Sequence, residues 1–485
     1  MKFSELDGKR IVLWGLGRET RALRAQLAER LPAASILATV DDHTPEQQLR
    51  ACLSQAQVLV RSPGVSIYKP VLMEYRKQGL TVTTATSLWL AQRGGARVIG
   101  VTGTKGKSTT ATVIAHLLRQ NTATELAGNI GRPVIDLLDT PPETWVVLEL
   151  SSYQIADLST GPQVAVLTNL YREHTDWHGS EDRYRADKLR LFGLPGVDRT
   201  VMPLEDGERW QVSGPLRNIA SAAAGTIGWS TDQAAVGTSG EPADQAAVST
   251  GGRSADLAVA GNGLWSADLV PAADSRWSID SQGAVCVYGQ VVVSPAQLPL
   301  KGRHNALNLV AALTALDAAE LAVPALPRAL DGLRPLPHRL QTVHREADGV
   351  EWVDDSISTT PESAIAAIEA FEQRPLVLIA GGSERDQHYG ELARRLTGRT
   401  ADSYVVTLPD TGVRIAEALE QAGFAKSRMS PAGDMRQAVL TARGYLQAGT
   451  VVLLSPAAPS YNSYRNFEER GDDFAALAGG VALSA

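Results

Sequence analysis

A glycine-rich turn near residue 105 carries the residue types that hold phosphate groups. An apolar stretch, "RVIGVT", precedes the turn "GTKGKST", and residues at helical spacing follow it. Glycines let successive backbone N–H groups point into one concavity, and the following helix adds its positive N-terminal end. A lysine here can reach the terminal phosphates, and a hydroxyl can ligate magnesium. The predicted nucleotide-binding residues are Gly103, Thr104, Lys105, Gly106, Lys107, Ser108 and Thr109.

The turn departs from the usual phosphate-loop form, because Val101 stands where the first glycine would be. An ordinary glycine-rich turn between a strand and a helix is therefore the alternative interpretation. The residues elsewhere in the chain decide between the two.

Polar side chains follow two further predicted strands. Glu149 lies at the end of "WVVLEL", and His174 follows "VAVLTNL". Open parallel sheets bind ligands at the carboxyl ends of their strands, and a carboxylate there can hold Mg²⁺ directly or through water. A helix-capping glutamate and a surface histidine are the alternatives. Their occurrence after consecutive strands favours a metal site.

Lys188, in "YRADKLRLF", lies on a predicted helix that is rich in charged residues. Such a helix face is ordinarily exposed to solvent. The residue type and its position alone do not assign a function to this lysine.

Composition limits the class of protein. The chain has 485 residues, of which 44% are hydrophobic, so it can build several cores, and we expect three domains. A net charge of -7 argues against nucleic acid as a partner. Cys52 and Cys286 match neither a disulfide framework nor a zinc site. Because no apolar stretch of membrane-spanning length and no signal-peptide core is present, we expect a cytoplasmic protein without a membrane partner.

The predicted elements alternate between strands and helices. The first series begins with "RIVLWGLG" and continues to about Gly95 as a small doubly wound domain. The second begins at "ARVIGVTG" and the third at "PLVLIAGGS", and both favour mostly parallel sheets. Residues 304–321 are predicted to form a helix. The predicted fold class is therefore α/β.

The segment from about residue 214 to 268 is rich in Ala, Gly, Ser and Asp, and it contains a duplication of twelve residues, 232–243 followed by 244–255. Two such copies are too few for a solenoid. We expect a flexible insertion.

The chain resembles the Mur ligase family of peptidoglycan synthesis. The resemblance depends on separated motifs in the family's order, spanning nearly the whole chain: "GVTGTKGKST", "LAGNIG", "LELSSYQI", "TNLYREHTDWHGSEDRYRADKLRLF", "KGRHNALN", "LPHRLQ" and "SPAAPSYNSYRNFEERGDDF". It implies a Rossmann-like N-terminal domain for the UDP moiety (1–93), a central P-loop ATPase domain that contains the insertion (94–330), and a Rossmann-like C-terminal domain for an amino acid (331–485).

The resemblance also implies the reaction. ATP would activate the carboxylate of UDP-N-acetylmuramoyl-L-alanine as an acyl phosphate, and the amine of glutamate would then attack it. Lys107 and two Mg²⁺ ions would stabilise the charge on the transferring phosphoryl group. Glu149, with Ser108, would serve one ion and His174 the other. Lys188 matches the lysine that the family carbamylates. A monomer is expected.

Further site residues are carried over by the same resemblance. The additional ATP contacts would be Asn305, Arg339 and Asp355. The UDP-muramoyl contacts would be Arg18, Asp41, Ser62, Gly64 and Asn129. The amino-acid contacts would be Thr359, Arg385, Ser460, Tyr461 and Phe467. Thr20 replaces the third glycine of a dinucleotide-binding signature, so NAD is not expected.

The departures from the family pattern lie in the amino-acid segment. Ile357 stands where the D-glutamate-adding enzymes have a lysine, and Arg385 replaces a second lysine. Arginine can bind a carboxylate through two parallel hydrogen bonds, from a different geometry. We therefore favour L-glutamate as the substrate, with D-glutamate as the alternative.

Two other activities stay open at this point. A folylpolyglutamate synthetase-like ligase shares the ATPase core but lacks an N-terminal UDP-binding domain. A nucleotide-dependent switch would need no glutamate-binding segment. Domain closure is also expected, with residues 323–337 as the hinge region.

Overall fold

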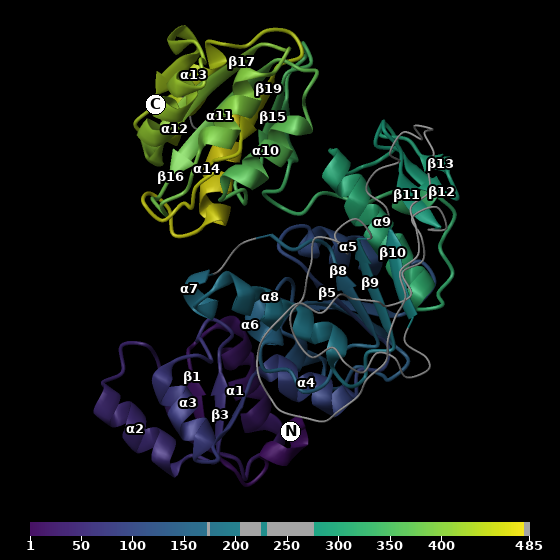
Figure 1. Cartoon of the computed structure of the whole chain (residues 1–485), viewed down its shortest axis with the longest axis vertical. Coiled ribbons are helices and arrows are strands. Elements are labelled where there is room, and N and C mark those ends of the chain that lie inside the picture. Colours follow the sequence, from purple (N-terminus) through teal and green to yellow (C-terminus); the bar gives the residue numbers. More distant parts are fainter. Residues whose placement is uncertain (172–174, 204–224, 230–275, 480–485) are drawn as a thin grey trace, which may run out of the picture. The chain divides into compact units, whose positions relative to one another are not determined.

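The computed structural model describes residues 1–171, 175–203, 225–229 and 276–479. His174 and the duplication at 232–255 lie outside the described residues. The chain divides into two compact units, the first formed by Met1–Ser294 with Ala306–Asp331 and the second by Pro295–Asn305 with Gly332–Ala485 (Figure 1). Each unit is described by itself, and the three-domain division with boundaries near 93 and 330 stays a prediction.

The first unit begins with a four-stranded parallel sheet of order β2-β1-β3-β4. Alternate residues of β1 face two cores: Ile11 and Leu13 pack on one side, and Val12 and Trp14 on the other. Helices therefore cover both faces, as the first sequence series predicts. The elements are β1 (Arg10–Trp14), α1 (Arg18–Arg30), β2 (Ser35–Val40), α2 (Glu46–Gln55), β3 (Val58–Arg61), α3 (Pro70–Lys77), β4 (Thr81–Thr83) and α4 (Ala85–Arg93).

The second sheet of this unit has six parallel strands in the order β10-β9-β8-β5-β7-β6. Strand β5 is buried along its whole length, which explains its uninterrupted apolar sequence. The strands are β5 (Val98–Thr102), β6 (Thr124–Gly128), β7 (Trp145–Glu149), β8 (Val164–Leu167), β9 (Arg199–Pro203) and β10 (Gly225–Trp229). The helices are α5 (Lys107–Leu118), α6 (Ser152–Ile155), α7 (Thr175–His178), α8 (Glu181–Leu189) and α9 (Arg303–Ala318).

A small antiparallel sheet precedes α9. Its strands are β11 (Trp277–Ile279), β12 (Val285–Val287) and β13 (Gln290–Val293). The sequence does not predict it, because strands of three or four residues are too short to display an alternating pattern.

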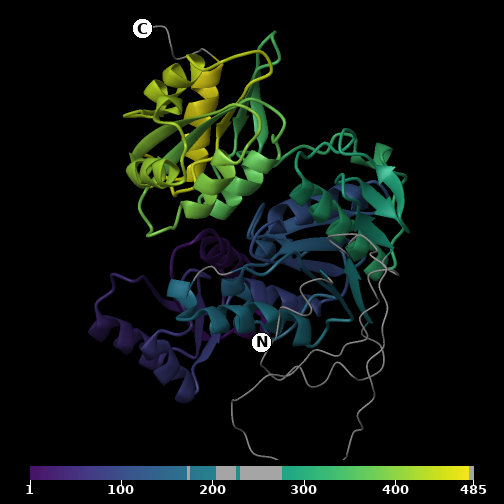
Figure 2. The same ribbon diagram turned by 45° about the horizontal axis from the view of Figure 1, so that its top comes forward.

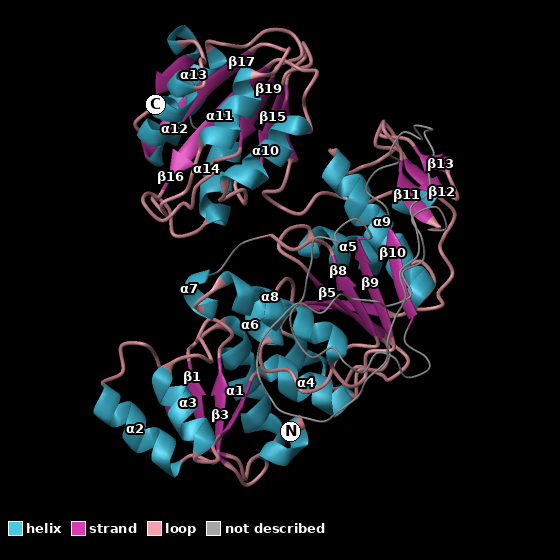
Figure 3. Cartoon of the chain, in the orientation of Figure 1, coloured by secondary structure: helices cyan, strands magenta, loops and turns pink. Residues whose placement is uncertain are grey.

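The second unit contains a six-stranded sheet of order β14-β15-β19-β16-β17-β18 (Figure 3). Only β14 runs antiparallel to its neighbour in this sheet. Figure 2 shows helices on both faces of the sheet, and two separate cores lie beneath them. The strands are β14 (Gln341–Arg345), β15 (Glu351–Asp354), β16 (Leu376–Gly382), β17 (Ser403–Asp410), β18 (Met429–Pro431) and β19 (Val451–Leu454). The helices are α10 (Pro361–Glu369), α11 (Gly390–Thr397), α12 (Thr411–Gln421), α13 (Met435–Arg443) and α14 (Phe467–Ala478).

The prediction of an α/β protein with mostly parallel sheets is confirmed. Among the described helices, none combines the length and the apolar content that crossing a bilayer requires.

Candidate active site

The glycine turn follows β5, at the centre of the six-stranded sheet of the first unit. Gly103 and Gly106 have φ angles of 147° and 80°, which favour glycine. A Cβ atom on Gly103 would lie 1.9 Å from Thr168 Oγ1, and one on Gly106 would lie 2.3 Å from Asn308 Oδ1. The close approach of these side chains therefore requires glycine at both positions.

Side chains that follow β8 hold the turn in place. Asn169 Oδ1 accepts a hydrogen bond from the backbone N–H of Lys105 at 2.8 Å, and Asn169 Nδ2 donates to the Lys105 carbonyl at 3.0 Å. Thr168 Oγ1 donates to the same carbonyl at 2.5 Å. The sequence prediction missed these two residues, although their place at the end of a strand beside β5 was a usable signal.

The side chains of Thr104 and Lys107 make hydrogen bonds to α8 and within the glycine turn. Thr104 Oγ1 lies 2.8 Å from the Tyr184 hydroxyl oxygen, and Lys107 Nζ donates to the Thr104 carbonyl at 2.8 Å. Helix α5 begins at Lys107, so the backbone N–H groups of its first turn belong to the predicted phosphate site. Ser108 and Thr109 are buried in that turn.

Glu149 is the last residue of β7, and it pairs with Val101 of β5. Its side chain is buried, and its Oε1 accepts a hydrogen bond from Asn129 Nδ2 at 3.0 Å. Its Oε2 is buried and has no hydrogen-bond partner among the described residues. Leaving a buried carboxylate oxygen unsatisfied is costly, whereas oxygen is the ligand that Mg²⁺ prefers. This oxygen is therefore available as one ligand of a magnesium ion.

Lys188 is only 2% exposed, so the expectation of a solvent-facing lysine on a charged helix is wrong. Its Nζ donates to the carbonyl of Gly103 at 2.8 Å and lies 5.0 Å from the centre of the Tyr184 ring. Helix α8 is fixed at its start by Ser180, whose Oγ accepts from the Arg183 N–H. The helix thereby brings Lys188 to the glycine turn.

The predicted second metal ligand, His174, lies outside the described residues. In the part of the chain that the structure describes, no three His, Cys, Asp or Glu side chains are grouped closely enough to hold a metal ion.

Four of the five predicted UDP-muramoyl residues lie at the carboxyl edge of the first sheet, and the fifth, Asn129, follows β6 of the second sheet. A Cβ atom on Gly17 would lie 2.7 Å from Ser62 Oγ, so the turn after β1 contacts the loop after β3, which also carries Gly64. Arg18, the first residue of α1, donates from Nη2 to the carbonyls of Asn129, at 2.9 Å, and Gly128, at 3.2 Å.

Asp41 follows β2 at the same edge. Its carboxylate accepts from the His43 N–H and the Thr44 hydroxyl, and these hydrogen bonds lower its pKa. The four residues Arg18, Asp41, Ser62 and Gly64 therefore follow three neighbouring strands.

Three predicted ATP contacts lie in the second unit. Asp355 follows β15, and its carboxylate accepts from the Leu340 N–H at 3.2 Å and from Ser455 Oγ at 2.8 Å. Burial raises the pKa of Asp355 to about 7. Asn305 Nδ2 donates to the Lys301 carbonyl. Burial, with the positive charge of Arg339 as a second cause, lowers the pKa of the neighbouring His304 to about 4.

The predicted amino-acid residues come from loops at the carboxyl ends of β15, β16 and β19. Gly382 of β16 approaches the Pro459 carbonyl so closely that a Cβ atom would lie 2.2 Å from it. The guanidinium of Arg385 lies 5.7 Å from the centre of the Tyr461 ring. Ser460 is buried and Tyr461 is 65% exposed.

Two more predicted residues border these loops. Thr359 accepts a hydrogen bond at its carbonyl from Gln387 Nε2, and Phe467 accepts one at its carbonyl from Ser356 Oγ. The second unit therefore brings its five predicted amino-acid contacts to one edge of its sheet, where α/β folds bind ligands.

Arg470 is a residue of this edge that the sequence prediction missed. Its side chain, 1% exposed, donates to the Ser356 hydroxyl and carbonyl and to the Ala458 carbonyl. Burial lowers its pKa to about 10. Its place in the motif "NFEERGDDF" was the available signal.

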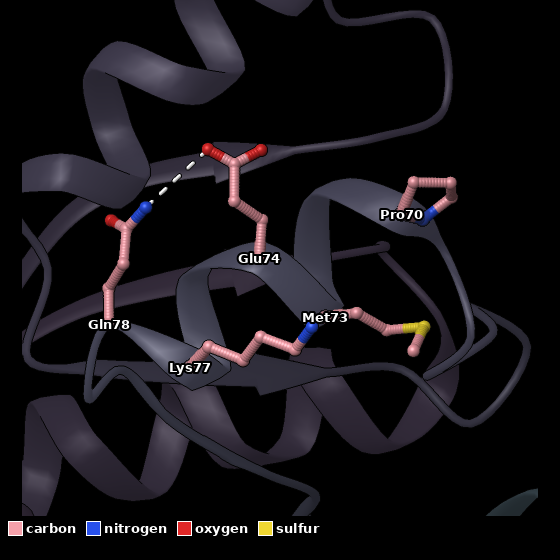
Figure 4. Close-up of a pocket in the computed structure, with 5 residues that line it drawn as sticks. All are labelled: Pro70, Met73, Glu74, Lys77 and Gln78. Carbon is pink, nitrogen blue, oxygen red and sulfur yellow. Dashed lines mark hydrogen bonds between the residues drawn. The ribbon is translucent and has the colours of Figure 1, made fainter.

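A surface pocket of about 510 Å³ lies along α3 (Figure 4). Its lining residues are Pro70, Met73, Glu74, Lys77 and Gln78. None of them is a predicted site residue, so this pocket does not form part of the candidate site.

Known proteins resemble the chain over nearly its whole length. The Mur ligase middle domain matches residues 101–235, and the Mur ligase, glutamate ligase domain matches residues 338–458. The chain is 35% identical to the UDP-N-acetylmuramoyl-L-alanine–L-glutamate ligase of Xanthomonas euvesicatoria pv. vesicatoria, covering 99% of this chain and 97% of that protein. It is 36% identical to the protein of the same name from Salinispora tropica, covering 98% of each.

Solved structures share the fold at low identity. The MurF ligase from Thermotoga maritima in complex with ADP is 18% identical, covers 90% of this chain and 92% of its own, and has a TM-score of 0.54. The UDP-N-acetylmuramate-alanine ligase MurC from the same organism is also 18% identical, covers 96% and 99%, and has a TM-score of 0.53. Because full-length relatives are more than a third identical, the chain belongs to the Mur ligase family, the ligases of peptidoglycan synthesis.

Proposed function

We propose that this chain joins L-glutamate to UDP-N-acetylmuramoyl-L-alanine with ATP as the energy source. The observation that carries the proposal lies at the carboxyl end of β5, where the buried Lys188 contacts the glycine turn and the buried Glu149 ends the neighbouring strand. The names of the full-length relatives support the two substrates.

The chemistry requires an activated carboxyl group, because a free carboxylate is a poor acyl donor. The alanyl carboxylate attacks the terminal phosphorus of ATP, ADP leaves, and an acyl phosphate forms. The amine of glutamate then attacks the acyl carbon, loses a proton, and phosphate leaves. Both reactants of the first step are anionic, so Lys107 and the N-terminal end of α5 stabilise the charge on the transferring phosphoryl group.

Magnesium, held by Glu149 and Ser108, would supply further positive charge at the phosphate oxygens. His174 and a carbamylated Lys188 are proposed for a second ion. In carbamylation the neutral amine of Lys188 adds to carbon dioxide and releases a proton, which converts a cation into a carboxylate.

L-glutamate is favoured over D-glutamate by the names of the relatives and by the residues of the second unit. Arg385 lies over Tyr461, and Ile357 offers no cation. Two carboxylates of the substrate must therefore be bound with a different set of cations from the D-glutamate-adding pattern. The expectation of a cytoplasmic monomer stays a prediction.

The test measures phosphate release by the purified chain with ATP, Mg²⁺, UDP-N-acetylmuramoyl-L-alanine and either glutamate enantiomer. We expect release that requires both the sugar nucleotide and L-glutamate. Phosphate release with D-glutamate and none with L-glutamate would overturn the proposed enantiomer but would leave the proposed ligase activity standing. Release with a folate in place of the sugar nucleotide would support the folylpolyglutamate synthetase-like alternative.

A further inference from the structure

A buried polar network connects the first sheet's substrate loop to the helix that carries Lys188. The loop is residues 62–69, which follow β3 and include Ser62 and Gly64. The network contains residues that the proposed chemistry does not use, namely Tyr68, Ser152, Trp177, His178 and Asp187. Four elements meet in it: the loop, α6, α7 and α8.

The short helix α7 binds the loop at two points. Trp177 Nε1 donates to the Gly64 carbonyl at 3.0 Å, and the Trp177 carbonyl accepts from Ser66 Oγ at 2.8 Å. The indole stacks on Tyr153 of α6 at 4.6 Å and meets Tyr68 edge-on at 5.9 Å. The position of Trp177 is thus tied to the loop by its backbone and its side chain together.

The next residue, His178, extends the connection to α6 and α8. Its ring is fully buried, with Nδ1 2.6 Å from Asp187 Oδ2 and Nε2 2.9 Å from Ser152 Oγ. Asp187 precedes Lys188, and Ser152 begins the helix that follows Glu149 closely in the chain. His178 therefore bridges the two segments that present the proposed metal-site residues.

Tyr68 makes a direct second link. Its hydroxyl donates to the Asp187 carboxylate at 2.7 Å, and the guanidinium of Arg183 lies 4.5 Å from the centre of its ring. Arg61 holds the middle of the loop, because its buried guanidinium donates to the Val65 carbonyl and pairs with Asp157 at 2.9 Å.

The side chains of Ser152, His178 and Asp187 are hydrogen-bonded in the same series as those of a Ser-His-Asp hydrolytic triad. All three residues, however, are less than a tenth exposed. No substrate carbonyl can reach Ser152 in such a setting, and Asp187 is also engaged by Tyr68. The geometry suits a positioning role instead.

We propose that α7 couples sugar-nucleotide binding to the nucleotide site: Trp177 follows the position of the loop, and His178 transmits it to the segments carrying Lys188 and Glu149. The inference rests on the proposed function, since it takes the sugar nucleotide as the ligand of the loop. Trp177 and His178 are positioning residues in this account. Their consequence is that each ligand tightens the binding of the other.

The test uses the full chain and calorimetric dissociation constants for UDP-N-acetylmuramoyl-L-alanine, without and with a saturating non-hydrolysable ATP analogue and Mg²⁺. The ratio of the two constants is the coupling factor, expected to be at least about fivefold in the wild type. Trp177→Phe keeps an aromatic ring but removes the donor to Gly64, and it should bring the factor close to one.

Trp277→Phe is the matched control. It removes an indole hydrogen bond of 2.6 Å to Asp317 in the same unit, outside the network, and should keep the wild-type factor. Tyr68→Phe removes only the hydroxyl that donates to Asp187, and it should also lower the coupling factor. This variant tests the proposed coupling if Trp177→Phe does not fold.

A wild-type factor of one, or a wild-type factor retained in both network variants, overturns the coupling. Either result, accompanied by normal L-glutamate-dependent phosphate release, leaves the proposed function intact. Absence of both sugar-nucleotide binding and phosphate release in the wild type would instead reject the proposed function.

Discussion

Asn129 is bound to Glu149 twice: its backbone N–H donates to the Glu149 carbonyl, and its side-chain amide donates to Glu149 Oε1, each at 3.0 Å. The pair joins the end of β6 to the end of β7. One carboxylate oxygen is thereby fixed, and the other, Oε2, is buried without a hydrogen-bond partner among the described residues. The carbonyl of Asn129 also accepts from Arg18, so the same residue touches the predicted substrate edge of the first sheet.

Replacing Asn129 by alanine should raise the Mg²⁺ concentration for half-maximal phosphate release by about tenfold to a hundredfold, because Glu149 loses the amide that orients it. A Mg²⁺ titration at saturating substrates measures this. Asn121→Ala, in the turn after α5, is the control. An unchanged Mg²⁺ requirement would show that Asn129 does not support metal binding by Glu149.

Lys107→Ala should lower kcat by about a hundredfold to a thousandfold, since the transferring phosphoryl group loses a cation. Lys77→Ala, on α3, should leave the rate unchanged. Both rates come from phosphate release with L-glutamate. A Lys107→Ala enzyme as active as the wild type would contradict the phosphate-loop assignment.

Gly382→Ala should weaken glutamate binding in the second unit. Gly382 has a φ of 154°, and a new Cβ atom would lie 2.2 Å from the Pro459 carbonyl, a backbone atom that cannot turn aside. The loops carrying Arg385 and Ser460 must then separate. We expect the KM for glutamate to rise at least about tenfold and the free energy of unfolding to fall by roughly 1–3 kcal/mol.

Gly423→Ala separates this clash from ordinary backbone strain. Its φ is also positive, at 86°, but nothing lies within 4 Å of a Cβ atom there. It should lower stability only slightly and leave the KM for glutamate unchanged. Equal effects of the two substitutions on KM would show that glutamate binding does not depend on the close approach of Gly382 to the Pro459 carbonyl.

Asp355 should make the stability of the protein depend on pH. Its pKa is 3.8 ordinarily and about 7 when buried in the native state, so the folded chain binds more protons between these values. Stability must therefore fall as pH rises through this window, by up to about 4 kcal/mol for this group. Denaturant unfolding of the wild type and of Asp355→Asn at pH 5 and pH 8 measures the difference.

The Asp355→Asn substitution loses a hydrogen-bond acceptor at every pH, so only the change between the two pH values tests the shift. The wild type should lose more stability from pH 5 to pH 8 than the variant does. A parallel loss in both proteins would show that Asp355 titrates near its ordinary pKa.

The sequence by itself determined the alternating strands and helices and the glycine turn. Buried parallel strands such as Val98–Thr102 have uninterrupted apolar runs, and the glycines at 103 and 106 mark a strand-to-helix turn. These signals are local, because period, propensity and turn chemistry act over a few residues. The predicted functions of Asn305 and Arg385 came from the family resemblance and stay predictions.

Only the tertiary structure decided which distant side chains meet. The contact of Lys188 with Gly103 and the bridge from Trp177 to Gly64 join residues 85 and 113 positions apart in the chain. The burial of Glu149 Oε2 likewise depends on what surrounds it. A charged residue on an isolated helix belongs in water. Packing against the carboxyl end of the sheet reverses that preference, because it supplies the carbonyl and aromatic partners that the sequence cannot display.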